Sequence, residues 1–244
     1  MALLEVIEVS KFFGALRALN RVSLSVEEGQ ILGLIGPNGS GKTTLFNVIT
    51  GYLPPTAGKI LFEGKIISGL SPYKICKQGI ARTFQTPKPF AGMTVYENLL
   101  VPLKFLRRDI KKASDMKQEA VQILEKLGLA GKFSAFASSL TLYEQRLLEL
   151  ARALICKPKL LLLDEVMAGL NPAETVQIVK ILREIYESYN ITLFIIEHNL
   201  RALMNIADSI VVLCQGEKIA EGKPEVILNS SKVIEAYLGE PYVA

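Results

Sequence analysis

The sequence predicts an α/β fold built on a mainly parallel sheet, with an antiparallel β region before it and a helical insert within it. Three observations carry this prediction. An apolar strand, a glycine-rich loop and a helix follow one another over residues 31–51, as at the start of many α/β units. Helical patterns dominate residues 87–156, and apolar runs typical of buried parallel strands return after residue 157. We therefore expect three parts, over residues 1–86, 87–156 and 157–244.

Residues 1–86 begin with strand patterns. Residues 3–9 are mostly apolar and β-prone, and apolar and polar side chains alternate over residues 22–27, which is typical of a half-buried strand. Residues 58–67 predict a hairpin with Glu63 and Gly64 at its turn. The helix after the glycine-rich loop is expected to end at Gly51.

In residues 87–156, two capping boxes mark helix starts. Thr94 and Glu97 form one S/T-x-x-E pattern, and Thr141 and Glu144 form the other. A further helix over residues 114–128 is expected to end at Gly128, because glycine favours the position just past a helix.

Residues 157–244 contain three apolar runs, over residues 160–164, 191–196 and 209–214. Such runs predict strands buried on both faces of a parallel sheet. A long helix is predicted between the first two runs, over residues 173–188. The expected buried face of this helix carries Val176, Val179, Leu182 and Tyr186.

The composition excludes several classes of protein. Half of the 244 residues are apolar, but no apolar run approaches the roughly 18 residues of a membrane span, and Glu5 and Glu8 make a signal peptide unexpected. The net charge of +4 is too small to indicate nucleic-acid binding. A single histidine rules out a histidine-rich metal site. The three cysteines are widely spaced, which argues against a disulfide framework or a zinc cluster: Cys76, Cys156 and Cys214.

The strongest motif is G-x-x-x-x-G-K-T, which predicts a phosphate-binding loop. Its backbone N–H groups would converge on phosphate oxygens at a helix N-terminus, where the helix dipole also favours an anion. Lys42 would reach the β- and γ-phosphates, and the Thr43 hydroxyl would bind Mg²⁺. A chance glycine-rich turn is the alternative, and it would arise in about one chain in a hundred of this length. The predicted nucleotide-binding residues of the loop are Gly36, Pro37, Asn38, Gly39, Ser40, Gly41, Lys42, Thr43 and Thr44.

Two acidic residues follow the apolar run of residues 160–163. The carboxyl edge of a parallel sheet is where ligands bind in such folds, so Asp164 would hold Mg²⁺ through water. Glu165 would polarise an attacking water as a general base. Without the phosphate loop, a buried strand followed by a charged loop would be the preferred interpretation.

His198 follows the apolar run of residues 191–196, in the same topological place as Asp164. A lone histidine is usually a surface or core residue. At this edge of the sheet, however, its imidazole could donate a hydrogen bond to the γ-phosphate.

Together these motifs resemble those of the ATP-binding subunits of ABC transporters, and the resemblance covers essentially the whole chain. Residues 82–85 (RTFQ) match the Q-loop, residues 160–165 match Walker B, and His198 matches the switch histidine. Phe13 matches the aromatic side chain that stacks on adenine. The resemblance implies a P-loop NTPase core that binds ATP and Mg²⁺. It also implies that Gln85 contacts Mg²⁺, senses the γ-phosphate and links the core to the helical insert.

Other segments narrow the resemblance. RTFQ, MTVYENLL (93–100), AGLNP (168–172) and AYLGE (236–240) are similar to segments in the ATP-binding subunits of branched-chain amino-acid importers, which have relatives in urea uptake and lipopolysaccharide export. The implied partners are membrane-spanning permease subunits, a second ATP-binding subunit as homo- or heterodimer and, indirectly, a solute-binding protein, but no nucleic acid. The implied location is the cytoplasmic face of the plasma membrane.

The family's signature, typically LSGGQ, is altered. Residues 140–144 read LTLYE, so both glycines are absent, although Thr141 and Glu144 keep the capping box. Leu142 and Tyr143 put side chains where backbone must approach phosphate closely, and loss of that contact is expected to cost about 10²-fold or more in rate. Because the resemblance implies that each signature serves the partner's site, we expect the partner to be a different subunit with an intact signature. The alternative is that Thr141 and the backbone N–H groups suffice.

Two smaller departures are Val166, where proline is usual, and Asn171, where aspartate is usual; both are expected to be tolerated. The leading function is Mg-ATP hydrolysis coupled to solute import, with Glu165, His198 and Gln85 as the catalytic residues. Alternatives are a nucleotide-gated assembly module with little hydrolysis and an ATPase for urea uptake or lipopolysaccharide export. A chromosome or DNA-repair ATPase is disfavoured, since the chain has neither a long coiled-coil insert nor a clear basic stripe.

Overall fold

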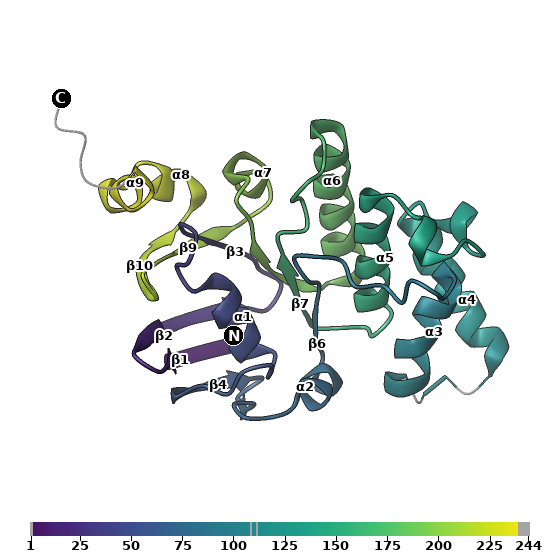
Figure 1. Cartoon of the computed structure of the whole chain (residues 1–244), viewed down its shortest axis with the longest axis horizontal. Coiled ribbons are helices and arrows are strands. Elements are labelled where there is room, and N and C mark those ends of the chain that lie inside the picture. The colour runs from purple at the N-terminus through teal and green to yellow at the C-terminus, as the bar shows by residue number, and fades with distance from the viewer. Residues whose placement is uncertain (1, 108, 111, 239–244) are drawn as a thin grey trace.

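Two sheets organise the chain (Figure 1). The computed structural model describes residues 2–107, 109–110 and 112–238. The first sheet is antiparallel and has the strand order β2-β1-β4-β5. Its strands are β1 (Ala2–Phe13), β2 (Leu16–Glu27), β4 (Ala57–Phe62) and β5 (Lys65–Ile66). The predicted turn lies between β4 and β5, where Glu63 and Gly64 have positive φ angles of 49° and 71°.

The second sheet has the order β10-β9-β3-β8-β7-β6 and is parallel except for the pair formed by β9 and β10. Its strands are β3 (Ile31–Ile35), β6 (Ile80–Arg82), β7 (Leu160–Asp164), β8 (Thr192–Ile196), β9 (Ser209–Cys214) and β10 (Glu217–Gly222). The predicted mainly parallel sheet and the antiparallel β region are therefore confirmed.

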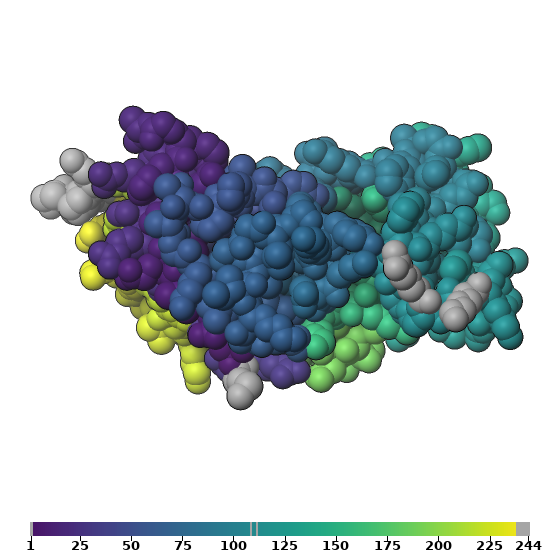
Figure 2. All heavy atoms as spheres, turned by 90° about the horizontal axis from the view of Figure 1, so that it is seen from below, coloured from purple at the N-terminus to yellow at the C-terminus, as the bar shows by residue number. Residues whose placement is uncertain are grey.

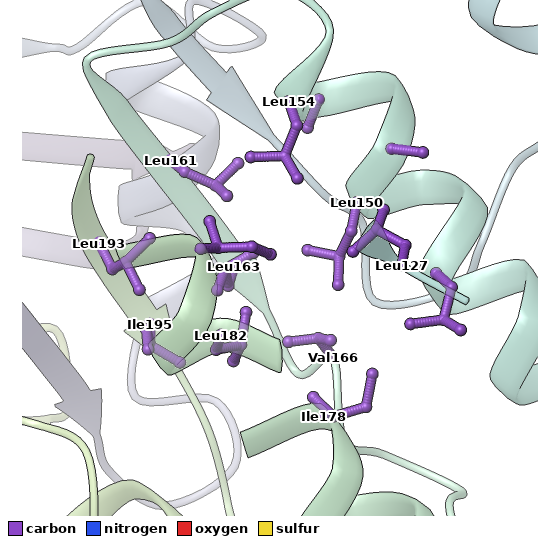
Figure 3. Close-up of a cluster of buried hydrophobic side chains, with 14 of the residues drawn as sticks. Leu127, Leu150, Leu154, Leu161, Leu163, Val166, Ile178, Leu182, Leu193 and Ile195 are labelled. Carbon is purple, nitrogen blue, oxygen red and sulfur yellow. The ribbon is translucent and has the colours of Figure 1, made fainter. Parts of the chain in front are cut away.

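Burial on both faces explains the unbroken apolar runs. Leu161 and Leu163 of β7 pack into a core with the helices on one face, shown with neighbouring side chains in Figure 3. Leu160 and Leu162 point to the opposite face and join a second core beneath the antiparallel sheet. Because successive side chains of a strand alternate between faces, both sets of positions must be apolar.

Helices surround the parallel sheet, and some of them lie beyond one end of it. They are α1 (Lys42–Ile49), α2 (Pro72–Gln78), α3 (Val95–Leu106), α4 (Ala113–Lys126), α5 (Leu142–Leu154), α6 (Pro172–Tyr189), α7 (Leu200–Met204), α8 (Pro224–Leu228) and α9 (Ser231–Leu238), with 3₁₀ turns η1 (Ala130–Lys132) and η2 (Ala137–Ser139). Helices α3 and α4 lie at the end of the molecule opposite the N-terminal strands (Figure 2), and α5 lies between them and the parallel sheet (Figure 1). No helix in the described part of the chain is long and apolar enough to cross a bilayer. The division at residues 86 and 156 stays a prediction.

The predicted helix signals act as expected. Both capping boxes form: Thr94 caps α3 with Glu97, and Thr141 caps α5 with Glu144. Helix α4 is followed by Gly128, which has a φ of +72°.

The predicted buried face of α6 was partly wrong. Val176 is 69% exposed, whereas the buried side chains are Ile178, Leu182 and Ile185. These three follow the i, i+4, i+7 spacing of one helical face, while Val176 lies two residues from Ile178 and so points roughly 200° away around the helix. The predicted buried face of α6 is therefore rotated around the helix axis from the face that packs on the sheet.

Candidate nucleotide site

The carboxyl ends of β3, β7 and β8 meet at one edge of the parallel sheet, beside a cavity of about 590 Å³. The cavity brings together most of the predicted site residues: Phe13, Asn38, Gly39, Ser40, Gly41, Lys42, Thr43, Thr44, Gln85, Glu165 and His198. Gly36, Pro37 and Asp164 are not part of its lining. Sequence reasoning missed four residues that complete it: Leu16, Arg17, Ala18 and Gln215.

Two glycines of the phosphate loop occupy positions where a side chain would collide with neighbouring backbone. Gly36 has a φ of +152°, and a Cβ there would lie 2.1 Å from the Leu213 carbonyl oxygen. Gly41 has a φ of +103°, and a Cβ there would lie 2.5 Å from the Ala18 carbonyl oxygen. Both glycines therefore let the loop pack against neighbouring backbone while it curves around the cavity.

Lys42 supplies a buried positive charge at the N-terminus of α1. Its Nζ donates hydrogen bonds to the carbonyl oxygens of Gly36, at 2.7 Å, and Pro37, at 3.0 Å. Burial lowers the pKa of Lys42, while the negative charges of Glu165 and Asp164 act to raise it. An anion in the cavity would meet this ammonium group, since Lys42 also lines the cavity.

Glu165 is held by the two other predicted catalytic residues, a pairing that the sequence did not predict. Gln85 Nε2 donates to Glu165 Oε2 at 2.8 Å, and His198 Nε2 lies 2.8 Å from Glu165 Oε1. Glu165 is 8% exposed and has a φ of +50°, an unusual backbone conformation for a residue with a side chain. Each carboxylate oxygen thus has a partner, which fixes the orientation of the group at the cavity wall.

Asp164 forms a buried ion pair that sequence reasoning missed. Arg82 Nη2 lies 2.6 Å from Asp164 Oδ2, and the two side chains are 5% and 1% exposed. Arg82 Nη1 donates to Asn47 Oδ1 at 2.7 Å, so the guanidinium group links the strand end to α1. These contacts join residues that are far apart in the sequence. The RTFQ motif contains Arg82 but does not indicate which residue Arg82 pairs with.

Replacing Arg82 by methionine should lower the free energy of unfolding by about 3–5 kcal/mol, since it leaves the Asp164 carboxylate buried and unpaired. Arg21→Met is the matched control, because the Arg21–Glu8 pair is 70% and 56% exposed and should contribute less than about 1 kcal/mol. Urea unfolding measures both. Equal losses in the two variants would contradict a structural role for the buried pair, and the double variant Arg82→Met, Asp164→Asn should recover part of the loss.

The predicted Mg²⁺ ligands fit a hydrated cation. Asp164 Oδ1 is buried and has no hydrogen-bond partner among the described residues, and the same holds for Ser40 Oγ. Thr43 and Gln85 line the cavity. In the described ranges, no three or more His, Cys, Asp or Glu side chains are grouped so that they could hold a metal ion by themselves. Mg²⁺ usually takes only one or two protein oxygens and completes its shell with water and phosphate.

Glu197 is a second buried carboxylate beside this edge, and sequence reasoning missed it. It is 2% exposed, and its Oε1 accepts a hydrogen bond from the Met167 N–H at 2.9 Å. Burial raises the pKa of Glu197 to about 7, and this N–H donor only partly offsets it.

This pKa predicts a pH-dependent stability. A carboxyl whose folded-state pKa is raised from 4.5 to about 7 stabilises the fold below pH 4.5 and loses that contribution as the pH rises through 7. As the pH rises from 4.5 to 8, the free energy of unfolding of Glu197→Gln should therefore increase relative to that of the unmodified chain, by up to about 3 kcal/mol. Urea unfolding at both pH values measures the gain, with the exposed Glu187→Gln as control. A difference that does not change with pH would contradict the prediction.

Comparison with known proteins identifies the family. A profile described as "ABC transporter" matches residues 19–168. The chain belongs to the ABC transporter ATP-binding family. A second profile, "Branched-chain amino acid ATP-binding cassette transporter", matches residues 217–243.

Similar proteins span nearly the whole of this ABC cassette. The high-affinity branched-chain amino acid transport ATP-binding protein BraF of Pseudomonas aeruginosa is 41% identical, with 98% of each chain covered. The corresponding protein LivG of Escherichia coli is 42% identical over 93% of this chain and 94% of its own length. MJ1267, an ATP-binding cassette solved in its ADP conformation, has a TM-score of 0.88 at 39% identity, covering 98% of this chain and 100% of its own.

Residues 140–144, which the sequence predicts to be an altered signature, lie outside the lining of this ABC cassette's own nucleotide cavity. The Thr141 Oγ1 accepts from the Glu144 N–H at 3.3 Å, so the start of α5 is intact, and Leu142 is 41% exposed. None of residues 140–144 lines the cavity. The other departures have local explanations: Val166 is buried in the core shown in Figure 3, and Asn171 caps α6 by accepting from the Glu174 N–H. The AYLGE segment ends beyond residue 238, so its last two residues lie outside the described residues.

Proposed function

We propose that this ATP-binding subunit hydrolyses Mg-ATP and that hydrolysis drives import of branched-chain amino acids. The observation that carries the catalytic part is the Glu165 carboxylate, which Gln85 and His198 hold at the wall of the phosphate-loop cavity. Phosphoryl transfer depends mainly on positioning and electrostatics, and the cavity offers both.

ATP binding follows from the cavity lining. The triphosphate lies along residues 36–44, where backbone N–H groups and the buried Lys42 ammonium group face it. Adenine stacks on Phe13, which lines the cavity and is 46% exposed.

Hydrolysis uses the fixed carboxylate. Glu165 orients the attacking water and accepts its proton, and His198 donates a hydrogen bond to the γ-phosphate oxygen. Gln85 positions Glu165 and contacts the γ-phosphate side of the cavity. Bound Mg²⁺, held by Thr43, Asp164 and Gln85, would neutralise charge on the phosphates.

The proposed solute and partners come from the similar proteins. BraF and LivG are described as branched-chain amino acid transport proteins, and the profile matching residues 217–243 carries the same description. We infer that this chain docks on membrane-spanning permease subunits at the cytoplasmic face of the membrane, with a solute-binding protein acting through the permease. A dimer is supported by the solved dimeric cassette MJ0796 bound to ADP and Pi, which has a TM-score of 0.82 at 25% identity.

We further propose an asymmetric dimer. This chain carries Glu165, Gln85 and His198 for its own site, but Leu142 and Tyr143 replace the signature glycines that would serve its partner's site. Leu142 is exposed, which is consistent with a surface that faces another subunit. We therefore expect the partner to be a second subunit with an intact signature.

Restoring glycine at the signature tests this asymmetry. The double variant Leu142→Gly, Tyr143→Gly should raise ATP hydrolysis of the purified chain alone by about 10²-fold, because a backbone phosphate donor becomes accessible. Leu142→Ala, Tyr143→Phe is the matched control and should leave hydrolysis low. High, cooperative hydrolysis by the unmodified chain alone would contradict the asymmetric dimer.

The altered signature also favours a second candidate function, in which ATP binding holds a complex together with little hydrolysis. Phosphate release should be measured with this chain alone and with the ATP-binding subunit that co-purifies with it from native membranes. Strong stimulation by that subunit supports the transport ATPase. ATP-driven dimerisation with negligible phosphate release in both samples supports the assembly module.

A further inference from the structure

Two of the three cysteines, Cys76 and Cys156, line the same cavity outside the nucleotide site. Cys76 lies in α2 and Cys156 lies just after α5. Each precedes by four residues one member of the parallel pair Ile80↔Leu160 that joins β6 to β7. The Lys159 N–H also donates to the Gly79 carbonyl oxygen at 2.8 Å, so the two chain segments run together into the sheet. This equal spacing from the paired strands places the two thiols on neighbouring segments.

Both thiols line one cavity of about 380 Å³, which is separate from the nucleotide cavity. Side chains of α3, including Val101, Pro102 and Phe105, form its other wall. Cys76 and Cys156 are half-buried, and neither is in a disulfide. An oxidant that enters the cavity would therefore reach both sulfur atoms.

The surroundings make the two thiols unequal. A side-chain hydrogen bond from Cys156 lowers the pKa of Cys76, and the same contact, together with burial, raises the pKa of Cys156. Cys156 Sγ also lies 3.4 Å from the Arg152 carbonyl oxygen. Because the thiolate is the nucleophile, Cys76 is the thiol that reacts first.

We propose that Cys76 and Cys156 form a reversible redox pair that hydrogen peroxide converts to a disulfide. The Cys76 thiolate attacks one peroxide oxygen and forms a sulfenic acid, and the departing hydroxide takes up a proton to become water. Cys156 sulfur then attacks the Cys76 sulfur, an S–S bond forms, and the second oxygen leaves as water with the Cys156 proton. The two thiols lose two electrons, which the peroxide gains.

The disulfide would join α2 to the end of α5 across the cavity wall. No residue of the nucleotide-cavity lining belongs to either helix, so nucleotide affinity should change less than twofold on oxidation. If the proposed function holds, this bond would limit movement of the helical segment against the sheet in the assembled transporter. The redox pair itself does not depend on that function.

Peptide mapping after peroxide treatment tests the pair. The chain of residues 1–244 is treated with hydrogen peroxide and its free thiols are alkylated, with and without subsequent dithiothreitol. The free-thiol count should fall from three to one, a Cys76–Cys156 disulfide peptide should appear, and dithiothreitol should restore all three thiols. Cys214→Ser is the matched control and should still form the disulfide, whereas Cys76→Ser and Cys156→Ser should not.

Two results would overturn the proposal: Cys76 and Cys156 remaining unlinked after peroxide treatment, or Cys214 entering disulfides as readily as they do. The chemistry is measured without nucleotide. Loss of the proposed ATPase function would therefore leave this result unchanged, and failure of the redox pair would leave the ATPase untouched.

Discussion

Glu165→Gln should lower kcat for ATP hydrolysis by about 10³-fold while leaving ATP affinity within a factor of about three. Glutamine has the size of glutamate and can still contact Gln85 and His198 through its amide. It cannot accept the proton of an attacking water, and it removes the negative charge that orients that water. The binding surface along residues 36–44 is unchanged, so ATP should be trapped rather than lost.

Steady-state phosphate release and equilibrium binding of radiolabelled ATP, measured on the same preparation, separate these two effects. Glu187→Gln on the exposed side of α6 is the control for a charge change outside the cavity. If Glu165→Gln kept more than a tenth of the unmodified turnover, Glu165 would not be the base, and the two hydrogen bonds to its carboxylate would have to be structural.

His198→Ala is expected to reduce kcat by roughly 10²-fold and to leave ATP affinity nearly unchanged. The substitution removes one hydrogen-bond donor toward the γ-phosphate and one of the two contacts that hold Glu165. The His198 side chain is 43% exposed, so its removal should cost little stability.

His198→Gln provides the informative comparison, because its amide N–H can donate where the imidazole does. It should recover part of the turnover lost in His198→Ala, and both variants should unfold at the same urea concentration as the unmodified chain within error. Normal turnover in His198→Ala would show that the only histidine has no role in hydrolysis.

The local signals in the sequence predicted most of the fold. The alternation over residues 22–27, the apolar runs of the parallel strands and the two capping boxes each depend on neighbours within a few residues, and each is present in the structure. The buried face of α6 was harder to predict, because Val176 is as apolar as Ile178 and only contact with the sheet decides which side of the helix is buried.

Contacts between distant segments could not be predicted. Arg82 pairs with Asp164, and Cys76 and Cys156 line one cavity, because β6 lies beside β7 in the sheet. Glu197 resembles a charged loop residue in the sequence, yet the fold buries it and raises its pKa to about 7. The fold places most of the site residues in the motifs together around one cavity.

The most direct test of the central claim is uptake of radiolabelled leucine, in the presence of the solute-binding protein, into liposomes that contain the native transporter purified with this chain. ATP supplied on the side that carries this subunit should drive leucine uptake with the unmodified chain and not with Glu165→Gln. Leucine uptake that is unaffected by Glu165→Gln, or no ATP-dependent uptake of any branched-chain amino acid, would contradict the account.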